Sequence, residues 1–266
     1  MEKRQASSFY PHFSTAERPE VDKFVGFFNS LLYQRNEILT DFLNPGQLDI
    51  LHQVFGNEFF IQEFGGWQGA EKKRVILANE WRNYTPADFK ITPLVINYAQ
   101  KFDHLSHSAI LGSLANSGLA LDTFGDIITD GSGNWQLMAK SELTDFFTEQ
   151  VDRIGSSRVR LRPITYKEVL LPQDDSQNRQ VVVPSLRLDA LLSKISRQSR
   201  TQIQRAIAAG LVKINWHEKA DSNIMVKVAD VISLRHFGRV RLEQVASTRK
   251  GKYRVELRIW QTKRNR

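Results

Sequence analysis

The feature that most constrains the fold is the uneven distribution of charge along the 266 residues. Residues 185–266 hold 19 lysines and arginines against 6 acidic residues, a net charge of +13, whereas residues 1–184 carry −5. The polar, proline-bounded run at residues 172–180 lies at the division and predicts a linker or a solvent-exposed hairpin loop, followed by a short strand at Val181-Val182-Val183. The sequence therefore predicts at least two domains. The basic domain fits a polyanion such as nucleic acid better than it fits a merely solvated surface.

The composition excludes several chemistries. The chain has no cysteine, so disulfides, cysteine-ligated zinc or iron–sulfur sites and cysteine nucleophiles are absent. Residues 1–8 have no apolar run like that of a secretion signal, and the most apolar window, residues 24–33, is too short for the roughly 20 residues that span a bilayer. We therefore expect a cytoplasmic protein with no segment inserted in a membrane.

Two amphipathic helices are predicted at the start of the basic segment. A helix near residues 186–195 is indicated by apolar residues spaced three and four apart, namely Leu188, Leu191, Leu192 and Ile195. Ser199 is a favourable N-cap for a second helix, which ends at Gly210, a residue type common just beyond helix C-termini. The candidate ligand-facing residues on these two helices include Arg187, Lys194, Arg200 and Gln204.

The rest of the basic segment alternates apolar and polar residues, as half-buried strands do. Residues 211–216 predict one strand, and residues 230–242 predict another that continues the alternation if the chain does not bulge at Gly238. The longer strand would expose Arg235, Arg239 and Arg241 on one face. Residues 253–259 predict a final strand, entered through a basic turn at residues 249–252. Helices and short strands with exposed arginines can dock a structured RNA through its phosphates.

An ordered series of residues in this segment resembles the S4 RNA-binding domain. The series is Arg187-Leu188-Asp189, Ser199-Arg200, Ile207, Gly210-Leu211-Val212, Asn215 and Asp230-Val231-Ile232, and it departs from the family at Ala229, where glycine is usual. The resemblance implies an RNA-facing surface that includes Arg187, Arg197, Arg200, Gln204, Arg205 and Lys213.

Several matching residues are better interpreted as structural. Asp189 fits the ion-pair partner of a neighbouring arginine, and Gly210 and Asn215 fit cap and turn residues. Trp216 and Trp260 are expected to pack rather than to stack on bases.

The residues before the basic segment predict helices followed by a mixed domain. Helical spacing of apolar residues predicts a helix over residues 19–43 and a second one ending near Phe55. We expect an N-terminal helical region over residues 1–58, a central domain over 59–171, a linker over 172–184 and the S4 domain over 185–266.

Within the central domain, the pattern predicts a small antiparallel sheet with helices. Strands near residues 126–129 and 135–139 would pair, with one helix ending at Gly118 and another over residues 143–154. The expected fold class is therefore α+β, and the arrangement of the RNA recognition motif is one candidate for the central domain.

Two blocks of the central domain resemble the YlmH family, including its cyanobacterial photosystem II S4-domain members. The blocks are Gly65-Gly66-Trp67 with Ala70-Glu71-Lys72-Lys73-Arg74, and His107 with Leu111-Gly112 and Gly125-Asp126-Ile127. The tail Ser233-Leu234-Arg235-His236-Phe237-Gly238-Arg239 is also similar to that family's ending. Departures occur at Trp67, Leu121-Asp122 and His236. The resemblance implies association with RNA and the ribosome, and we expect a second RNA contact at Lys72, Lys73, Arg74 and His107.

No pattern typical of catalysis or metal binding is evident. His104 and His107 are three residues apart without an evident third ligand, and Asp126 and Glu71 fit turn and ion-pair residues better than a catalytic pair. The glycine-rich turns lack the spacing of a phosphate loop, and signatures of pseudouridine synthases, methyltransferases and tRNA synthetases are not found. We therefore expect no catalytic activity, cofactor or metal.

The leading hypothesis is a monomeric RNA-binding protein that binds rRNA, tRNA or both on the large ribosomal subunit. One alternative is an RNA-modifying enzyme whose catalytic domain has no recognisable motif. Another is an assembly factor for protein partners of the photosynthetic apparatus, which only the naming of the relatives suggests.

Overall fold

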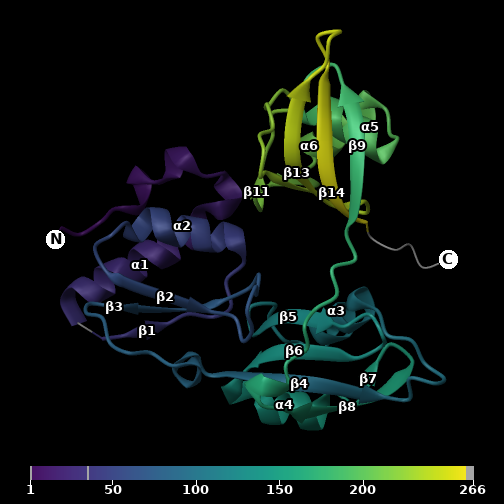
Figure 1. Cartoon of the computed structure of the whole chain (residues 1–266). Helices are drawn as coiled ribbons and strands as arrows, with labels where there is room; N and C mark the ends of the chain where they lie inside the picture. Colours follow the sequence, from purple (N-terminus) through teal and green to yellow (C-terminus); the bar gives the residue numbers. More distant parts are fainter. Residues whose placement is uncertain (1, 35, 262–266) are drawn as a thin grey trace. The chain divides into compact units, whose positions relative to one another are not determined.

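The chain folds into two compact units, Met1–Gln173 and Asp174–Arg266 (Figure 1). The computed structural model describes residues 2–34 and 36–261. The division between the units falls between the mildly acidic and the strongly basic parts of the sequence. Each unit has its own apolar core.

The first unit begins with two helices packed on a small antiparallel sheet. Helix α1 (Arg18–Gln34) follows three short 3-10 helices and buries Val21, Phe24, Val25, Phe28 and Leu31. Helix α2 (Pro45–Phe55) begins after Asn44, whose side chain accepts hydrogen bonds from the N–H groups of Gly46 and Gln47. The sheet has the order β1-β3-β2, from strands β1 (Ile38–Leu39), β2 (Phe60–Phe64) and β3 (Arg74–Ala78).

Two expectations for this region differ from the structure. The prediction that the first helix continues to Leu43 is wrong, because α1 ends at Gln34 and Ile38 and Leu39 pair with β3. The expected boundary at residue 58 also cuts through a shared core, since Val75 and Leu77 of β3 pack with the residues of α1 and α2. Strands β2 and β3 therefore belong with the N-terminal helices.

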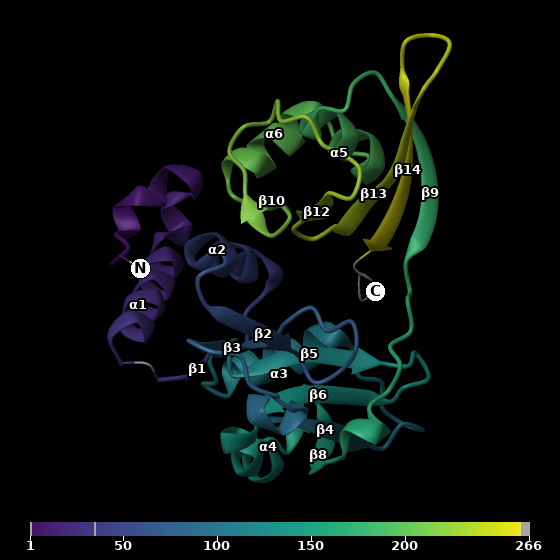
Figure 2. The ribbon, with the colours of Figure 1, turned by 60° about the vertical axis from the view of Figure 1, so that its left-hand side comes forward.

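The remainder of the first unit has the βαββαβ topology of the RNA recognition motif. Its elements are β4 (Ile91–Tyr98), α3 (His107–Asn116), β5 (Phe124–Thr129), β6 (Trp135–Lys140), α4 (Thr144–Gln150), β7 (Arg153–Ile154) and β8 (Ser157–Pro163). The strands form an antiparallel sheet in the order β5-β6-β4-β8-β7. Ile110, Leu114 and Phe147 bring both helices onto one face of it (Figure 2). The α+β class is thus confirmed.

The predicted details of this domain are confirmed in part. β5 pairs with β6, as expected from the sequence, and α3 ends two residues before Gly118. The prediction of one helix over residues 143–154 is wrong in length, because α4 stops at Gln150 and Arg153 and Ile154 form strand β7.

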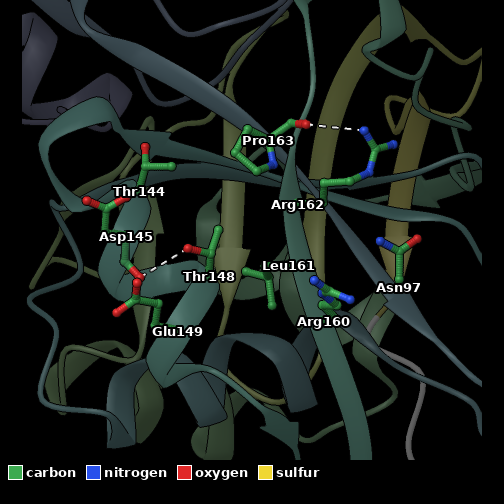
Figure 3. Close-up of a pocket in the computed structure, with 9 residues that line it drawn as sticks. All are labelled: Asn97, Thr144, Asp145, Thr148, Glu149, Arg160, Leu161, Arg162 and Pro163. Carbon is green, nitrogen blue, oxygen red and sulfur yellow. Dashed lines mark hydrogen bonds between the residues drawn. The ribbon is translucent and has the colours of Figure 1, made fainter.

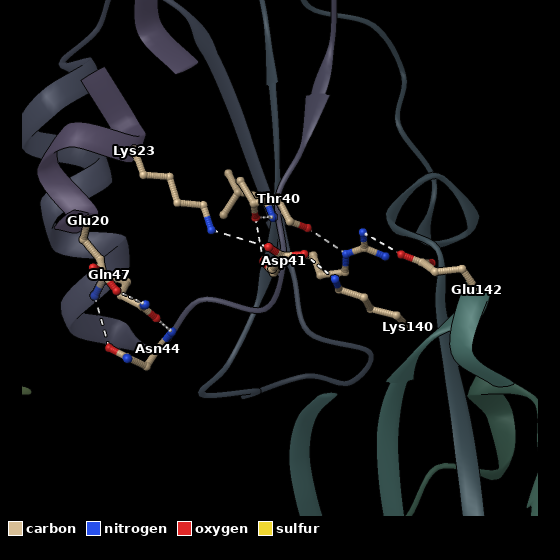
Figure 4. Close-up of polar contacts among 10 residues, drawn as sticks. Glu20, Lys23, Thr40, Asp41, Asn44, Gln47, Lys140 and Glu142 are labelled. Carbon is tan, nitrogen blue, oxygen red and sulfur yellow. Dashed lines mark hydrogen bonds and ion pairs between the residues drawn. The ribbon is translucent and has the colours of Figure 1, made fainter. Parts of the chain in front are cut away.

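Polar and apolar contacts join the N-terminal helices and sheet to this domain (Figure 4). Asp41 binds Lys140 at the end of β6, and its Oδ2 lies 3.4 Å from the Nζ of Lys23 on α1. Phe42 and Met138 are buried in a shared apolar cluster. These contacts explain why the chain up to Gln173 forms a single unit.

In the second unit, two helices pack on one face of a six-stranded antiparallel sheet. Helix α5 (Leu188–Ser196) and helix α6 (Arg200–Ala208) contribute Leu188, Leu191, Leu192, Ile195, Ile203 and Ile207 to the core, which confirms both predicted helices. The sheet order is β11-β10-β12-β13-β14-β9. Its strands are β9 (Gln177–Val183), β10 (Val212–Ile214), β11 (His217–Glu218), β12 (Val231–Leu234), β13 (Gly238–Ser247) and β14 (Tyr253–Gln261).

Two predictions for the second unit require correction. Much of the expected linker over residues 172–184 is strand β9, which pairs with β14 and buries Val181 and Val183. The expected strand over residues 230–242 is a hairpin, because the chain turns at His236, whose φ of 65° lies in the left-handed region. Arg235 therefore lies in the turn and not on the strand face of Arg239.

Candidate nucleic-acid interface

A buried aspartate organises the polar residues of α5 and α6. The side chain of Asp189, in the first turn of α5, has no exposed surface. Arg187 donates hydrogen bonds to it from Nε over 3.1 Å and from Nη2 over 3.0 Å. The Nη2 of Arg200 donates over 2.8 Å and the Nε2 of Gln204 over 2.9 Å. The interpretation of Asp189 as an ion-pair partner is confirmed, and its carboxylate fixes the positions of three predicted RNA-facing side chains.

These contacts keep Asp189 ionised. Burial alone would raise the pKa of the carboxyl group, but the hydrogen bonds from Arg187, Gln204 and Arg200 outweigh burial and hold the pKa at about 2. The side chains of Arg187 and Arg200 nevertheless remain 35% and 51% exposed. Asp189 therefore orients both arginine side chains, and each keeps part of its surface open to solvent.

The other predicted residues of the two helices are exposed. Lys194 lies in the last turn of α5, Arg197 follows that helix with a φ of 59°, and Arg205 lies in α6. The hydroxyl of Ser199 caps α6, and the positive end of this helix dipole begins at Arg200. We call these residues the helix group: Arg187, Lys194, Arg197, Arg200, Gln204 and Arg205.

The predicted basic residues of the strands lie on the opposite side of the sheet. Alternate strand residues, including Val212, Ile232 and Val240, point into the core shared with α5 and α6. The side chains between them, which belong to Lys213, Arg239 and Arg241, therefore point away from the helices. The ten predicted residues of this unit thus divide between two faces and the turn at Arg235.

Neighbouring side chains contact all three of these strand residues, and the Nε of Arg241 is 3.9 Å from a carboxylate oxygen of Glu243. The Nζ of Lys213 is 3.5 Å from Glu218 on the adjacent strand. The guanidinium carbon of Arg239 lies 5.3 Å from the ring centroid of Trp216, a cation–π contact that fits the expected packing role of this tryptophan. The side chains of Lys213 and Arg241 are 46% and 45% exposed, compared with 35% and 51% for Arg187 and Arg200, so exposure alone does not separate the two faces.

The expected second contact in the first unit is only partly available. Arg74 is 4% exposed, and its guanidinium donates to the carbonyl oxygens of Thr40 and Lys90 over 2.8 and 2.9 Å. The prediction of an RNA contact at Arg74 is therefore wrong, because β3 is buried on both faces and the arginine joins neighbouring segments instead.

The three remaining residues of that prediction differ in their contacts. Lys72 donates to the carbonyl oxygens of Leu121 and Phe124, and Lys73 is 2.9 Å from a carboxylate oxygen of Glu63. His107 is exposed as the first residue of α3. Their contact with RNA stays a prediction.

The two sequence blocks of the central region meet in the structure at Asp126. Its carboxylate accepts hydrogen bonds from the indole Nε1 of Trp67 over 3.2 Å and from the backbone N–H groups of Glu71 and Lys72 over 2.8 and 3.1 Å. Burial raises the pKa of this carboxyl group above its usual value, and the three donors oppose the shift. Asp126 therefore fastens the loop between β2 and β3 to strand β5.

The described residues hold no group of side chains suited to ligate a metal ion. A shallow recess between α4 and the edge strand β8 is lined by threonines, carboxylates and arginines (Figure 3). No three histidine, aspartate or glutamate side chains converge within residues 2–34 and 36–261, and no helix there is long and apolar enough to cross a membrane.

An S4-type helix pair with its sheet, preceded by a domain with RNA-recognition-motif topology, defines a two-module nucleic-acid-binding class of protein. Residues 186–232 match the S4 domain, and residues 85–168 match the "Putative RNA-binding domain in YlmH". The chain belongs to the YlmH family. It is 36% identical, over 251 residues, to the "Ribosome-associated protein quality control protein P2" of Bacillus subtilis (strain 168). The aligned region covers 94% of this chain and 97% of that relative.

A solved structure supports the same assignment. The "Cell division protein ylmH from Streptococcus pneumoniae" has a TM-score of 0.51 and 29% sequence identity, over 60% of this chain and 97% of that one. The match to the YlmH domain begins at residue 85, beyond strand β3, which agrees with the grouping of β2 and β3 with the N-terminal helices.

Proposed function

We propose that this protein is a ribosome-associated, non-catalytic RNA-binding protein that acts in the cytoplasm as a monomer and binds rRNA, tRNA or both on the large ribosomal subunit. The observation that carries the proposal is the helix group, in which a buried carboxylate presents two arginines beside the N-terminus of α6. The name of the Bacillus subtilis relative, which describes a ribosome-associated protein, supports a ribosomal site of action.

The chemistry of the helix group suits phosphate better than base edges. Arginine presents a planar fork of donors that matches two phosphate oxygens, and orientation by Asp189 reduces the entropy lost when the contact forms. Phosphate contacts fix the position of a protein on RNA without reading much sequence. We therefore expect recognition of RNA shape, with affinity that falls linearly with salt on a log–log plot.

The test is co-sedimentation of the full chain with purified large ribosomal subunits at about 150 mM salt, where charges beyond roughly 8 Å are screened. Arg205→Glu should reduce the pelleted fraction sharply, whereas Lys227→Glu, an equal charge change at an exposed loop residue of the same unit, should not. Arg205 is preferable to Arg200 because Arg200 also holds Asp189. Equal pelleting of the wild type and both variants would contradict the assignment of the interface.

A second measurement tests the absence of catalysis. Large-subunit rRNA and tRNA are incubated with the protein, with and without a methyl donor, and digested for mass spectrometry. Unchanged nucleoside masses are expected, and any new mass that depends on the protein would favour the RNA-modifying alternative.

A further inference from the structure

We propose that the central domain contacts the phosphate backbone of RNA through a row of arginines on strand β8, and not by stacking bases on the middle of its sheet. The inference rests on the proposed function, since it concerns a second contact with the same class of ligand.

The middle of the sheet is not open to bases. Domains with this topology commonly stack bases on aromatic side chains exposed on the sheet face opposite the helices. Here Met138 on that face is buried against Phe42 and its neighbours. Gln136, also on that face, is 4% exposed, donates to the carbonyl of Glu168 over 2.9 Å and accepts from the N–H of Leu170 over 2.9 Å.

The uncovered part of this face carries no aromatic side chain on the middle strands. In the C-terminal half of β4, Val95 and Asn97 point away from the helices. They pair with Arg162 and Arg160 of β8, respectively. The aromatic residues Trp135 and Tyr98 pack with the helices on the other face. Base stacking on β4 and β6 is therefore not available in this structure.

Strand β8 instead presents a regular row of cations. Ser157, Val159 and Leu161 are buried, and the residues that alternate with them, Arg158, Arg160 and Arg162, are exposed. Arg153 lies directly opposite Arg158 across the β7–β8 hairpin. With a rise of about 3.3 Å per residue, the three arginines of β8 follow one another at about 6.6 Å. The three arginines therefore form an extended line of positive charge along β8.

The charge of this row is not neutralised within the fold. Residues 153–163 contain four arginines and no acidic residue, although residues 1–184 as a whole carry −5. None of the four arginines forms an ion pair with another residue in the described part of the chain. The nearest carboxylates include Glu168 beside Arg162, and Asp145 and Glu149 on α4 (Figure 3).

These carboxylates define where the ligand can lie. Asp145 and Glu149 on α4 line the recess together with Arg160 and Arg162, so they repel a polyanion that approaches from α4 and favour approach from the sheet face opposite the helices. β8 also lies at an edge of the sheet beyond its short pairing with β7, which leaves room for an extended backbone. The structure thus favours an RNA strand that follows the row, with recognition independent of base identity.

The experiment measures binding of the full chain to large-subunit rRNA, poly(A) and poly(U) as a function of salt. Arg158→Glu with Arg160→Glu should weaken binding to all three RNAs at least tenfold at about 100 mM salt and reduce the log–log salt slope by about two, one for each lost phosphate contact. The control with an equal charge change, Lys3→Glu with Lys101→Glu at exposed residues, should remain within about twofold of the wild type. Arg158→Lys with Arg160→Lys should retain most of the affinity and shows that the strand tolerates substitution.

The outcomes separate this inference from the proposed function. If Arg158→Glu with Arg160→Glu leaves affinity and salt slope unchanged while Arg205→Glu still weakens binding, the inference is wrong and an acidic protein becomes the partner that the row fits. A loss confined to poly(A) or to poly(U) would also overturn it, because it would indicate base recognition. If the wild-type chain binds none of the RNAs, the proposed function itself fails.

Discussion

Asp189→Asn is the substitution that most directly tests whether one buried carboxylate organises the interface. The amide has nearly the shape of the carboxylate but retains only one acceptor oxygen for the four hydrogen bonds from Arg187, Arg200 and Gln204. Its NH2 group would also point at other donors. We expect the second unit to be destabilised and the two arginines to lose their fixed orientation.

The magnitude follows from the pKa of Asp189, which is about 2 compared with 3.8 for an unperturbed aspartate. At 1.36 kcal/mol for each pKa unit, the folded state stabilises the carboxylate by about 2 kcal/mol. Hydrogen bonds to a charged group contribute about 1.5–3 kcal/mol each, but Arg187 and Arg200 are partly exposed and can bond to water after the substitution. We therefore expect a loss of about 2–4 kcal/mol.

The assay is amide hydrogen exchange of peptides from α5 and α6, measured at pH 7 in the full chain. A loss of 2–4 kcal/mol should accelerate exchange by about 30- to 1000-fold, and Glu256→Gln, the same charge change at an exposed residue, should change it little. Because the pKa of Asp189 is lowered by folding, its contribution is present above about pH 4 and is lost as the pH falls toward 2. Acceleration below threefold, or the same loss of protection at low pH in the variant, would refute the reasoning.

Three further predictions concern other parts of the chain. The pKa of His52 is raised by its hydrogen bond to Glu63, so its stabilising contribution is present below about pH 6.5 and lost as the pH rises through the raised pKa; Glu63→Gln should lower the pKa of His52 in an NMR titration. Ser199→Ala should destabilise the second unit by about 1 kcal/mol through loss of the α6 cap, seen as faster exchange of α6 amides. Ala229, with a φ of 73°, should be replaceable by glycine with a gain of about 0.5–1 kcal/mol in the denaturation of the second unit, and a loss would show that the left-handed conformation is not strained.

The elements that the sequence predicted well are those in which local and tertiary signals agree. Helix α6 has a capping serine, an apolar stripe through Ile203 and Ile207, and a glycine after its C-terminus, so its bounds followed from the chain alone. Asp189 was predictable as an ion-pair partner because it lies between basic residues in a first helical turn. Its four hydrogen bonds were not, since Arg200 and Gln204 come from another helix.

The wrong predictions concern segments whose side chains are polar although their backbones pair within a sheet. Residues 177–180 of β9 are polar and exposed, so the strand is held by pairing with β14, which composition does not reveal. The run Lys72-Lys73-Arg74 has the composition of a surface, but Arg74 enters a strand buried on both faces. The alternation of arginines in β8, without an acidic residue between them, is visible in the sequence and predicts an exposed basic strand face.

The pairing of β9 with β14 sets the order in which the second unit can be completed during synthesis. Val183 pairs with Tyr253, and Gln177 pairs with Ile259. Strand β9, at the start of the unit, can therefore pair only after the residues of β14, at the end of the unit, have been synthesised. At about 5–20 residues per second, the 70 residues that separate Val183 from Tyr253 take about 4–14 s to appear. During that interval Val181 and Val183 have no strand to cover them, and the sheet lacks its outer edge. A ribosome that stops between residues 233 and 252 would therefore hold a nascent chain that contains the whole S4 match while its sheet is still open.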